Sequence, residues 1–213
     1  MEIEDAGTLQ QQAIKLSLVT EGQMAEALDA TGIRNPDLQQ VLRQLERLGY
    51  LTPWQTSKLL KGETDGFFLG GYRILYKIAS GSFGRVYRAD DPQSGNVVAI
   101  KVLRRRWSED KQKIDLFIRE GKVGMTLKHP SIVEIHAFNQ DVHSGQYYIV
   151  MEFVEGGNLR EILQRRKTLT AAEALQIVED CAAGLAYAYA RGLTHRDIKL
   201  TNLLISTADG HAK

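Results

Sequence analysis

The stretch HRDIKLTN, at residues 195–202, includes an aspartate, a lysine and an asparagine, three different chemical types at short, fixed spacing. Asp197 is a carboxylate that can accept a proton, and Lys199 is a compact positive charge two positions later. Asn202 offers the neutral oxygen that a hard cation such as Mg²⁺ prefers. An aspartate five positions before an asparagine means little alone, whereas the complete eight-residue string is highly specific. Its meaning depends on the motifs that precede it.

The composition excludes several classes of protein. The chain has 213 residues, 43% apolar and 25% charged, which is the balance of a soluble protein with one or two domains. A net charge of +1 gives no indication of nucleic-acid or membrane-surface binding. The start MEIEDAG is not a signal peptide and no apolar run is long enough to be a membrane segment, so we expect a cytoplasmic protein. The single cysteine and five histidines show no zinc spacing.

Residues 1–64 have helical periodicity and contain a weak internal repeat. LVTEGQMAEAL (18–28) aligns with YLTPWQTSKLL (50–60), and each copy has a threonine three positions before a glutamine. This is capping-box spacing, in which both side chains satisfy free amides at a helix start. We predict about four short helices, a small all-α module without catalytic residue types, which is a possible docking site for a partner protein.

The periodicity changes after DGFFLGG (65–71), which we interpret as a linker. The runs YRILYKIA, GRVYRAD, NVVAIKVL and QYYIVMEFV are β-branched and aromatic, as in antiparallel strands. Residues 113–128 are helical in pattern but are weakened by Gly121 and Gly124. TAAEALQIVEDCAAGLAYAYARG gives the strongest helix, with a capping box from Thr170 to Glu173. The fold class is therefore α+β.

Two further features in the second segment carry chemistry. In ASGSFGRV (79–86), Gly81 and Gly84 allow the backbone to approach a phosphate closely, although a plain hairpin turn is an equally good interpretation of that loop alone. A strand follows the loop where a dinucleotide-binding loop would have a helix. VVAIK places Lys101 at a strand end, and Glu120 lies nineteen residues later in a predicted helix. Taken singly, each would be an ordinary surface residue.

The order of these motifs resembles the protein-kinase family. ASGSFGRV, VAIK, a helical glutamate, HPSIV, MEFVEGGNL and HRDIKLTN follow one another at ordinary kinase spacings over residues 72–213. The sequence is most similar to bacterial (Hanks-type) serine/threonine kinases. The resemblance implies a kinase N-lobe over 72–154, made of an antiparallel sheet and one helix. It also implies a partial helical C-lobe over 155–213.

The same resemblance implies ATP and Mg²⁺ as cofactors and a protein serine or threonine as substrate. Asp197 would orient the hydroxyl and accept its proton, Lys199 would steady the γ-phosphate, and Asn202 would bind one Mg²⁺. Lys101 would hold the α- and β-phosphates and pair with Glu120. The remaining implied nucleotide contacts are Ala79, Ser80, Gly81, Ser82, Phe83, Gly84, Val86, Ala99, Met151, Glu152, Val154, Asn158 and Leu204.

The sequence departs from the family pattern in three places. Ala79 replaces the first glycine of the loop, where a methyl group should be tolerated. Gly124 stands four residues after Glu120, where kinases usually have a bulky apolar residue, so we expect a loosely held helix. The chain contains no Asp-Phe-Gly, whose aspartate is the main Mg²⁺ ligand in kinases, and Asp209 in a turn is not a substitute. We therefore expect a truncated kinase that is inactive alone, with an apolar face of the helix at 171–191 exposed.

Three interpretations remain open from the sequence. The first is an ATP-dependent serine/threonine kinase. The second is a non-catalytic, nucleotide-binding scaffold whose N-terminal helices dock a partner. The third is an interaction domain in which only the helical module matters. An Asp-Phe-Gly encoded shortly after residue 213 would favour the first.

Overall fold

The computed structural model describes residues 3–213 and divides into two compact units, Met1–Val97 and Val98–Lys213. The first unit contains four helices followed by three strands: α1 (Ala6–Lys15), α2 (Glu21–Asp29), α3 (Leu38–Arg47), α4 (Pro53–Leu60), β1 (Phe68–Leu69), β2 (Tyr72–Ser80) and β3 (Gly84–Asp90). The second contains β4 (Val97–Leu103), the 3₁₀ turn η1 (Arg105–Trp107), α5 (Lys111–Gly124), β5 (Ile135–Gln140), β6 (Tyr147–Glu152), α6 (Leu159–Arg166), α7 (Ala171–Tyr189) and η2 (Leu200–Asn202).

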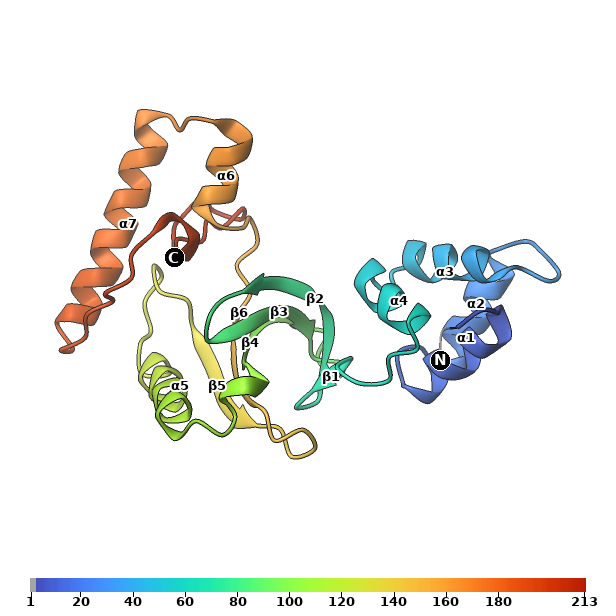
Figure 1. Cartoon of the computed structure of the whole chain (residues 1–213). Coiled ribbons are helices and arrows are strands. Elements are labelled where there is room, and N and C mark those ends of the chain that lie inside the picture. The colour runs from blue at the N-terminus through green and yellow to red at the C-terminus, as the bar shows by residue number, and fades with distance from the viewer. Residues whose placement is uncertain (1–2) are drawn as a thin grey trace. The chain divides into compact units, whose positions relative to one another are not determined.

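Helices α1 to α4, called the helical module below, form a small bundle near the N-terminus (Figure 1). Capping boxes predicted from the threonine–glutamine spacing are confirmed at the starts of α2 and α4. A third box, Asp37 with Gln40, begins α3. The apolar faces enclose one core, whose fully buried members include Leu9, Met24, Leu45 and Leu59.

The segment interpreted as a linker contributes to both neighbours. Phe67 is buried in the core of the helical module. Phe68–Leu69 forms β1, which pairs antiparallel with β2 at Arg73 and Tyr72. The amide of Ile74 donates to the Phe67 carbonyl at 2.8 Å. Residues 67–69 are therefore fixed on one side by apolar burial and on the other by strand hydrogen bonds.

Strands β2 and β3 form the hairpin that carries the glycine-containing loop. Arg73 faces Asp90 across the ladder and donates two hydrogen bonds, at 3.0 and 2.6 Å, to its carboxylate. Register shifts occur between Ile74 and Tyr76 and again between Lys77 and Ala79. These bulges bend β2 on its way to the loop.

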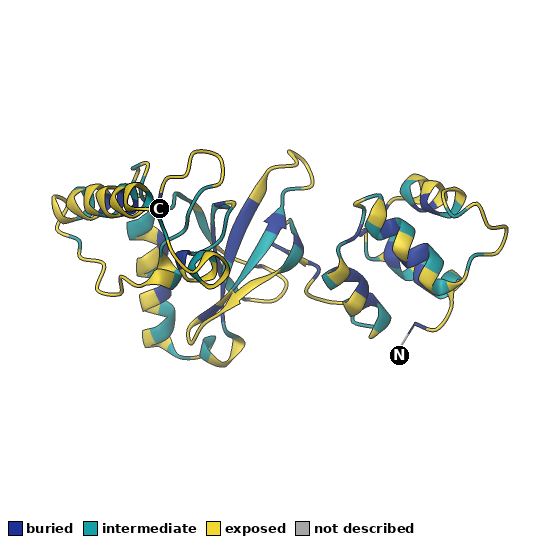
Figure 2. Ribbon diagram, turned by 90° about the horizontal axis from the view of Figure 1, so that it is seen from above, coloured by how far each residue is buried: buried dark blue, intermediate teal, exposed yellow. Residues whose placement is uncertain are grey.

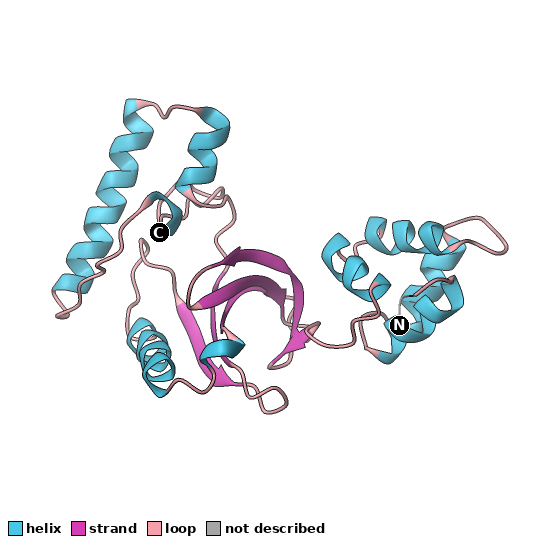
Figure 3. Cartoon of the chain, viewed as in Figure 1, coloured by secondary structure: helices cyan, strands magenta, loops and turns pink. Residues whose placement is uncertain are grey.

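The second unit is built on β4, β6 and β5, in that spatial order, all antiparallel. Strands are magenta and helices cyan in Figure 3. Lys101 on β4 lies opposite Ile149 on β6. Helix α5 packs on β5, and Leu103, Phe117 and Ile149 form the buried core between helix and strands.

Helices α6 and α7 follow, and α7 begins with the predicted Thr170–Glu173 capping box. Only part of α7 is buried, with Ile177, Asp180 and Gly184 on its inner side. Leu175, Val178 and Tyr189 are exposed. Exposed residues are drawn in yellow in Figure 2. Across residues 3–213, none of the helices combines the length and apolar character needed to cross a bilayer.

Candidate active site

Asp197, Lys199 and Asn202 converge in one cluster. The ammonium group of Lys199 donates to both carboxylate oxygens of Asp197, at 3.0 and 2.7 Å. The amide nitrogen of Asn202 donates to the Asp197 carbonyl at 2.9 Å and to its carboxylate at 3.0 Å. The turn η2 brings Asn202 back onto Asp197 across five residues.

The backbone beside this cluster is held in an uncommon conformation. Arg196 has a φ of +63°, in the left-handed region that costs a non-glycine residue roughly 1–2 kcal/mol. Its guanidinium donates to the Thr194 hydroxyl at 3.1 Å, and the Asp197 amide donates to the His195 ring at 3.3 Å. These two contacts join residues within the short stretch 194–197, around Arg196.

The electrostatics of the cluster keep Asp197 ionised. Hydrogen bonds from Lys199 are the largest cause that lowers the pKa of Asp197, and burial opposes them. The Asn202 amide and the Lys199 charge add to the lowering, so the net direction is downward. A carboxylate with a lowered pKa is a weaker base than usual and stays a hydrogen-bond acceptor.

Lys101 and Glu120 form a second pair. The lysine ammonium lies 2.5 Å from a carboxylate oxygen of Glu120, which joins β4 to α5. The pair is formed despite Gly124, because α5 approaches β5 closely at that glycine. A Cβ built on Gly124 would lie 2.2 Å from Cδ1 of Ile135, so the isoleucine side chain fills the space that a bulkier residue at 124 would need. Sequence reasoning missed Ile135, because the contact depends on how closely helix and strand approach.

The implied adenine-side residues line the neighbouring strands. Ala99 on β4 is buried and lies opposite Met151 on β6. Glu152 follows, and its carboxylate accepts from the Glu134 amide at 2.7 Å and from the Lys213 ammonium at 2.6 Å. Val154 is buried just beyond the strand.

Asn158 is engaged in local structure. Its side-chain oxygen caps α6 by accepting from the Glu161 amide at 3.1 Å. It also forms an isolated β-bridge with Leu204, which is half-buried. A ribose contact by Asn158 would require its side chain to leave the cap or to be shared with it.

The glycine-loop residues belong to the other compact unit. The Gly81 amide donates to the Gly84 carbonyl at 2.9 Å, which closes the turn between β2 and β3. Ala79 and Val86 are register partners at the mouth of this hairpin, and Ser80 lies opposite Arg85. Phe83 is 42% exposed at the tip. The plain hairpin turn and the glycine-containing loop are thus the same element.

The donor set fits a magnesium ion in one respect. The Asn202 nitrogen is committed to Asp197, which leaves its side-chain oxygen as the atom available to a cation. Among residues 3–213, no group of three or more His, Cys, Asp or Glu side chains is arranged to hold a metal. Phosphate oxygens and water would have to complete the coordination shell of a Mg²⁺ ion held there by Asn202.

Comparison with known proteins places these features in a family. Residues 72–213 match the protein kinase domain family. Serine/threonine-protein kinase PknJ of Mycobacterium tuberculosis is 39% identical over 145 residues, which cover 68% of this chain and 24% of PknJ. PrkC of Bacillus subtilis is 40% identical over 136 residues, covering 64% and 21%. The chain thus spans less than a third of the length of either relative.

A solved structure agrees with the fold. The crystal structure of the Mycobacterium tuberculosis PknI kinase domain superposes with a TM-score of 0.58 at 31% identity, covering 69% of this chain and 59% of that chain. The expected α+β kinase-like fold is therefore confirmed. With a matching family over two thirds of its length, this chain belongs to the protein kinase domain family and is similar to bacterial serine/threonine kinases.

Proposed function

We propose that the protein is an ATP-dependent serine/threonine kinase, and that these 213 residues bind Mg·ATP without transferring phosphate on their own. The observation that carries the proposal is the Asp197–Lys199–Asn202 cluster, with its hydrogen bonds of 2.7 to 3.0 Å. Lysine two positions after the catalytic aspartate is typical of serine/threonine rather than tyrosine kinases. The substrate would therefore be a protein serine or threonine, as in the named relatives.

The family resemblance assigns the roles, and the hydrogen bonds around Asp197 support them. Asp197 accepts a hydrogen bond from the substrate hydroxyl, and takes its proton as the hydroxyl oxygen bonds to the γ-phosphorus and the bond to the β-phosphate oxygen breaks. Lys199 moves its charge from Asp197 to the transferred phosphoryl group, which raises the basicity of Asp197 at that moment. The side-chain oxygen of Asn202 would hold Mg²⁺, which would supply charge neutralisation at the phosphates. Lys101, held by Glu120, contacts the α- and β-phosphates.

The glycine-loop amides of Ser82, Phe83 and Gly84 would cover the phosphates. By the family resemblance, Val86, Ala99 and Leu204 would enclose the adenine, with Met151 at the back of the pocket. The backbone of Glu152 and Val154 would bond the adenine edge. The sequence contains no Asp-Phe-Gly, so a ligand with the charge that Mg²⁺ needs is missing from these residues. Binding is therefore expected without efficient transfer.

Nucleotide binding is the first test. At Mg·ATP about tenfold above its dissociation constant, we expect the melting temperature to rise by roughly 3–5 °C, as ligand linkage predicts for a chain of this size. Lys101→Met should remove this shift. Lys128→Met is the matched control, because Lys128 is an exposed lysine that also faces a glutamate, Glu134, at 3.7 Å. A shift that survives Lys101→Met would contradict the proposed site.

Phosphoryl transfer is the second test. We expect no transfer of ³²P from labelled ATP to a generic protein substrate by these 213 residues. Transfer that is lost in Asp197→Asn would overturn the expectation of inactivity while supporting the kinase assignment. The non-catalytic scaffold is the alternative function. It is favoured if a longer chain containing an Asp-Phe-Gly also binds nucleotide without transfer.

A further inference from the structure

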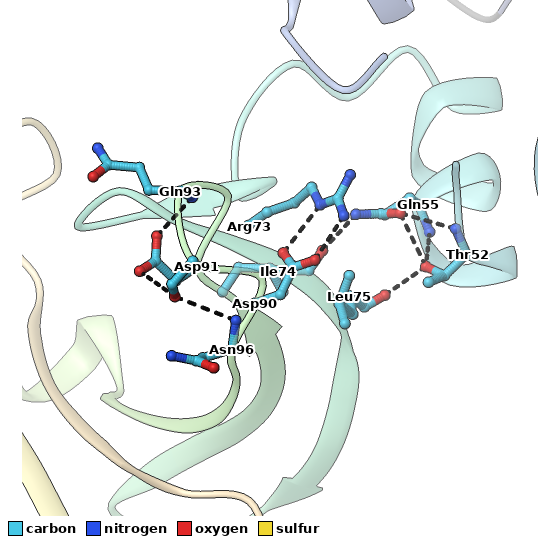
Figure 4. A network of polar contacts seen from close by, with 10 residues as sticks. Thr52, Gln55, Arg73, Ile74, Leu75, Asp90, Asp91, Gln93 and Asn96 are labelled. Carbon is cyan, nitrogen blue, oxygen red and sulfur yellow. Dashed lines mark hydrogen bonds and ion pairs between the residues drawn. The ribbon is translucent and has the colours of Figure 1, made fainter. Parts of the chain in front are cut away.

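Two backbone carbonyls at the bulge in β2 accept hydrogen bonds from side chains of the helical module. The register shift between Ile74 and Tyr76 makes Leu75 the extra residue of the strand, and an extra residue leaves the ladder of hydrogen bonds. The Leu75 carbonyl accepts from the Thr52 hydroxyl at 2.5 Å. The neighbouring Ile74 carbonyl accepts from the Gln55 side-chain nitrogen at 2.8 Å, and Figure 4 shows both bonds entering β2 from the start of α4.

The two side chains that make these bonds also form the capping box of α4. The Gln55 side-chain oxygen accepts from the Thr52 amide at 2.9 Å, and the Thr52 hydroxyl oxygen accepts from the Gln55 amide at 3.3 Å. Gln55 is fully buried, at 0% exposure. A buried amide with both of its polar atoms bonded fixes its neighbours in one arrangement, because any slip leaves a buried group unpaired.

The equivalent box in the first copy of the repeat lacks this burial. Thr20 and Gln23 cap α2 with bonds of 2.9 and 3.1 Å, but Thr20 is exposed and Gln23 is only half-buried. The capping box therefore has one role at α2, where it only caps the helix. At α4 it has two roles, because it caps the helix and also hydrogen-bonds β2. This difference provides an internal control for the role of the second copy.

Aromatic packing supports the contact beside the polar bonds. Trp54, which lies between Thr52 and Gln55, packs edge-on against Tyr87 of β3, with ring centroids 6.2 Å apart. Lys58 on the next turn of α4 lies over both Trp54 and Phe67, 5.3 Å from each ring centroid. Helix α4 thus contacts both strands of the hairpin that ends in the glycine-containing loop.

We propose that the helical module is a built-in brace for β2, with Thr52 and Gln55 as positioning residues for the glycine-containing loop at 81–84. Beyond the bulge, residues 77–80 are exposed. The part of β2 that is held by burial therefore lies around Ile74, where the strand is bonded to α4. Fixing this bulge holds β2 at the start of its path to Gly81, ahead of the second register shift between Lys77 and Ala79. The brace itself follows from contacts within one compact unit, whereas its effect on nucleotide rests on the proposed function.

Hydrogen exchange on the full 213-residue chain tests the brace. Gln55→Glu keeps a side-chain oxygen for the cap but removes the donor to Ile74, and Gln23→Glu makes the same change in the exposed box. We expect amide exchange in residues 72–84 to accelerate about tenfold in Gln55→Glu, the scale of one lost buried hydrogen bond, and to remain at the wild-type rate in Gln23→Glu. Equal exchange of residues 72–84 in the two variants would overturn the proposal.

A second matched pair covers the case in which a buried glutamate prevents folding. Thr52→Ala and Thr20→Ala each remove one helix-capping oxygen, but only the first removes the donor to Leu75. Faster exchange of residues 72–84 in Thr52→Ala alone supports the brace, and Thr52→Ser, which restores a hydroxyl, should return it to the wild-type rate. Similar exchange of these residues in both alanine variants contradicts it.

Nucleotide affinity then tests the coupling separately. A fluorescent ATP analogue titrated at a temperature where all variants are folded should bind several-fold more weakly to Thr52→Ala than to Thr20→Ala. Equal affinities would refute the positioning of the loop even if exchange accelerates. If the wild-type chain binds no nucleotide, the proposed function fails, and the exchange pattern still decides whether the helical module braces β2.

Discussion

Gly121 and Gly124 of helix α5 both pack against strand β5, but against different kinds of side-chain atoms. A Cβ at Gly121 would lie 2.9 to 3.1 Å from the Cδ2, Cβ and Cγ atoms of Phe138, atoms close to the backbone of β5. A Cβ at Gly124 would lie 2.2 Å from Cδ1 of Ile135, the far end of a flexible side chain. The first neighbour has little freedom to move, whereas the second can change its side-chain rotamer.

This difference predicts the order of stability of two alanine variants. Alanine in a helix interior gains up to about 1 kcal/mol over glycine from propensity. At Gly121 the clash with Phe138 should outweigh that gain and reduce the free energy of unfolding by about 1–3 kcal/mol. Gly124→Ala should lose less, because Ile135 can turn away. Urea unfolding of both variants measures the order, and a Gly121→Ala chain as stable as wild type would contradict it.

A third glycine provides the control for that series. At Gly22 in α2, the position that a methyl group would take has only the Thr20 hydroxyl oxygen nearby, at 3.9 Å. Gly22→Ala should therefore leave stability unchanged or raise it by a few tenths of a kcal/mol, showing the propensity effect without a clash. Destabilisation in all three variants would indicate that the distance from the added methyl group to its nearest neighbour does not decide stability.

The site shows which residues a sequence can reveal. Asp197, Lys199 and Asn202 lie within six residues, so the local turn brings them together and the motif alone predicts the cluster. Ile135 is fifteen residues from Glu120 and carries no functional group. Its position opposite Gly124 depends on the distance between α5 and β5, which periodicity does not encode. The missing bulk at 124 is a signal in the sequence, but the residue that replaces it is visible only in the packing.

At the scale of elements, α7 is joined to the C-terminal turn through Asp180. Its carboxylate is largely buried and accepts from the Ala212 amide at 2.8 Å and faces the His211 ring nitrogen at 3.0 Å. Burial acts to raise the pKa of Asp180, but the hydrogen bonds from Ala212, His211 and Gln176 together lower it. The Asp180 carboxylate in turn raises the pKa of His211 above its ordinary value of 6.5, and Asp209 adds to that effect.

This contact predicts a loss of stability with rising pH. Because the folded-state pKa of His211 is above its unfolded value, the contribution is complete below about pH 6.5 and is lost as the pH rises through the raised pKa. The wild-type chain should unfold at lower urea concentration at pH 8 than at pH 6, and His211→Asn should reduce this difference. His143→Asn, which changes an exposed turn histidine, should keep it. An unaltered pH dependence in His211→Asn would rule out the contact as its source.

The capping boxes show how far local spacing reaches. Threonine, aspartate or asparagine stands three residues before glutamine or glutamate at the starts of α2, α3, α4, α6 and α7. The spacing is readable in the sequence because each cap is made within one helical turn. The spacing does not distinguish a box exposed to water from one that also bonds a strand. That second role of Thr52 and Gln55 depends on a bulge about twenty residues later in the chain.

At the scale of the whole molecule, composition shifts predict the change from helices to strands but not the limits of the compact units. The first unit extends to Val97 and joins the helical module to β1, β2 and β3. Phe67 is one reason that the helical module and the strands form one unit. This aromatic residue of the segment 65–71 is buried in the core of the helical module. The domain limits 1–64, 65–71, 72–154 and 155–213 remain predictions based on motif boundaries.

The exposed face of α7 predicts self-association of the chain. Val178 is 63% exposed, Leu175 is 59% exposed and Tyr189 is 74% exposed, at positions that share one side of the helix. Apolar side chains grouped in this way favour contact with another apolar surface. We expect the apparent mass in light scattering to rise with protein concentration. Val178→Lys should weaken the association by placing a charge within the apolar face.

The control places the same charge elsewhere on the helix. Ala183→Lys adds a lysine at an exposed position of α7 outside the row formed by Leu175 and Val178, so it changes net charge equally without interrupting that row. Its mass should follow the wild-type curve. If both lysine variants dissociate to the same extent, charge repulsion rather than the apolar face governs the association. A wild-type chain that stays monomeric at all concentrations, with a sharp cooperative melt, would show that this face does not drive contact between copies.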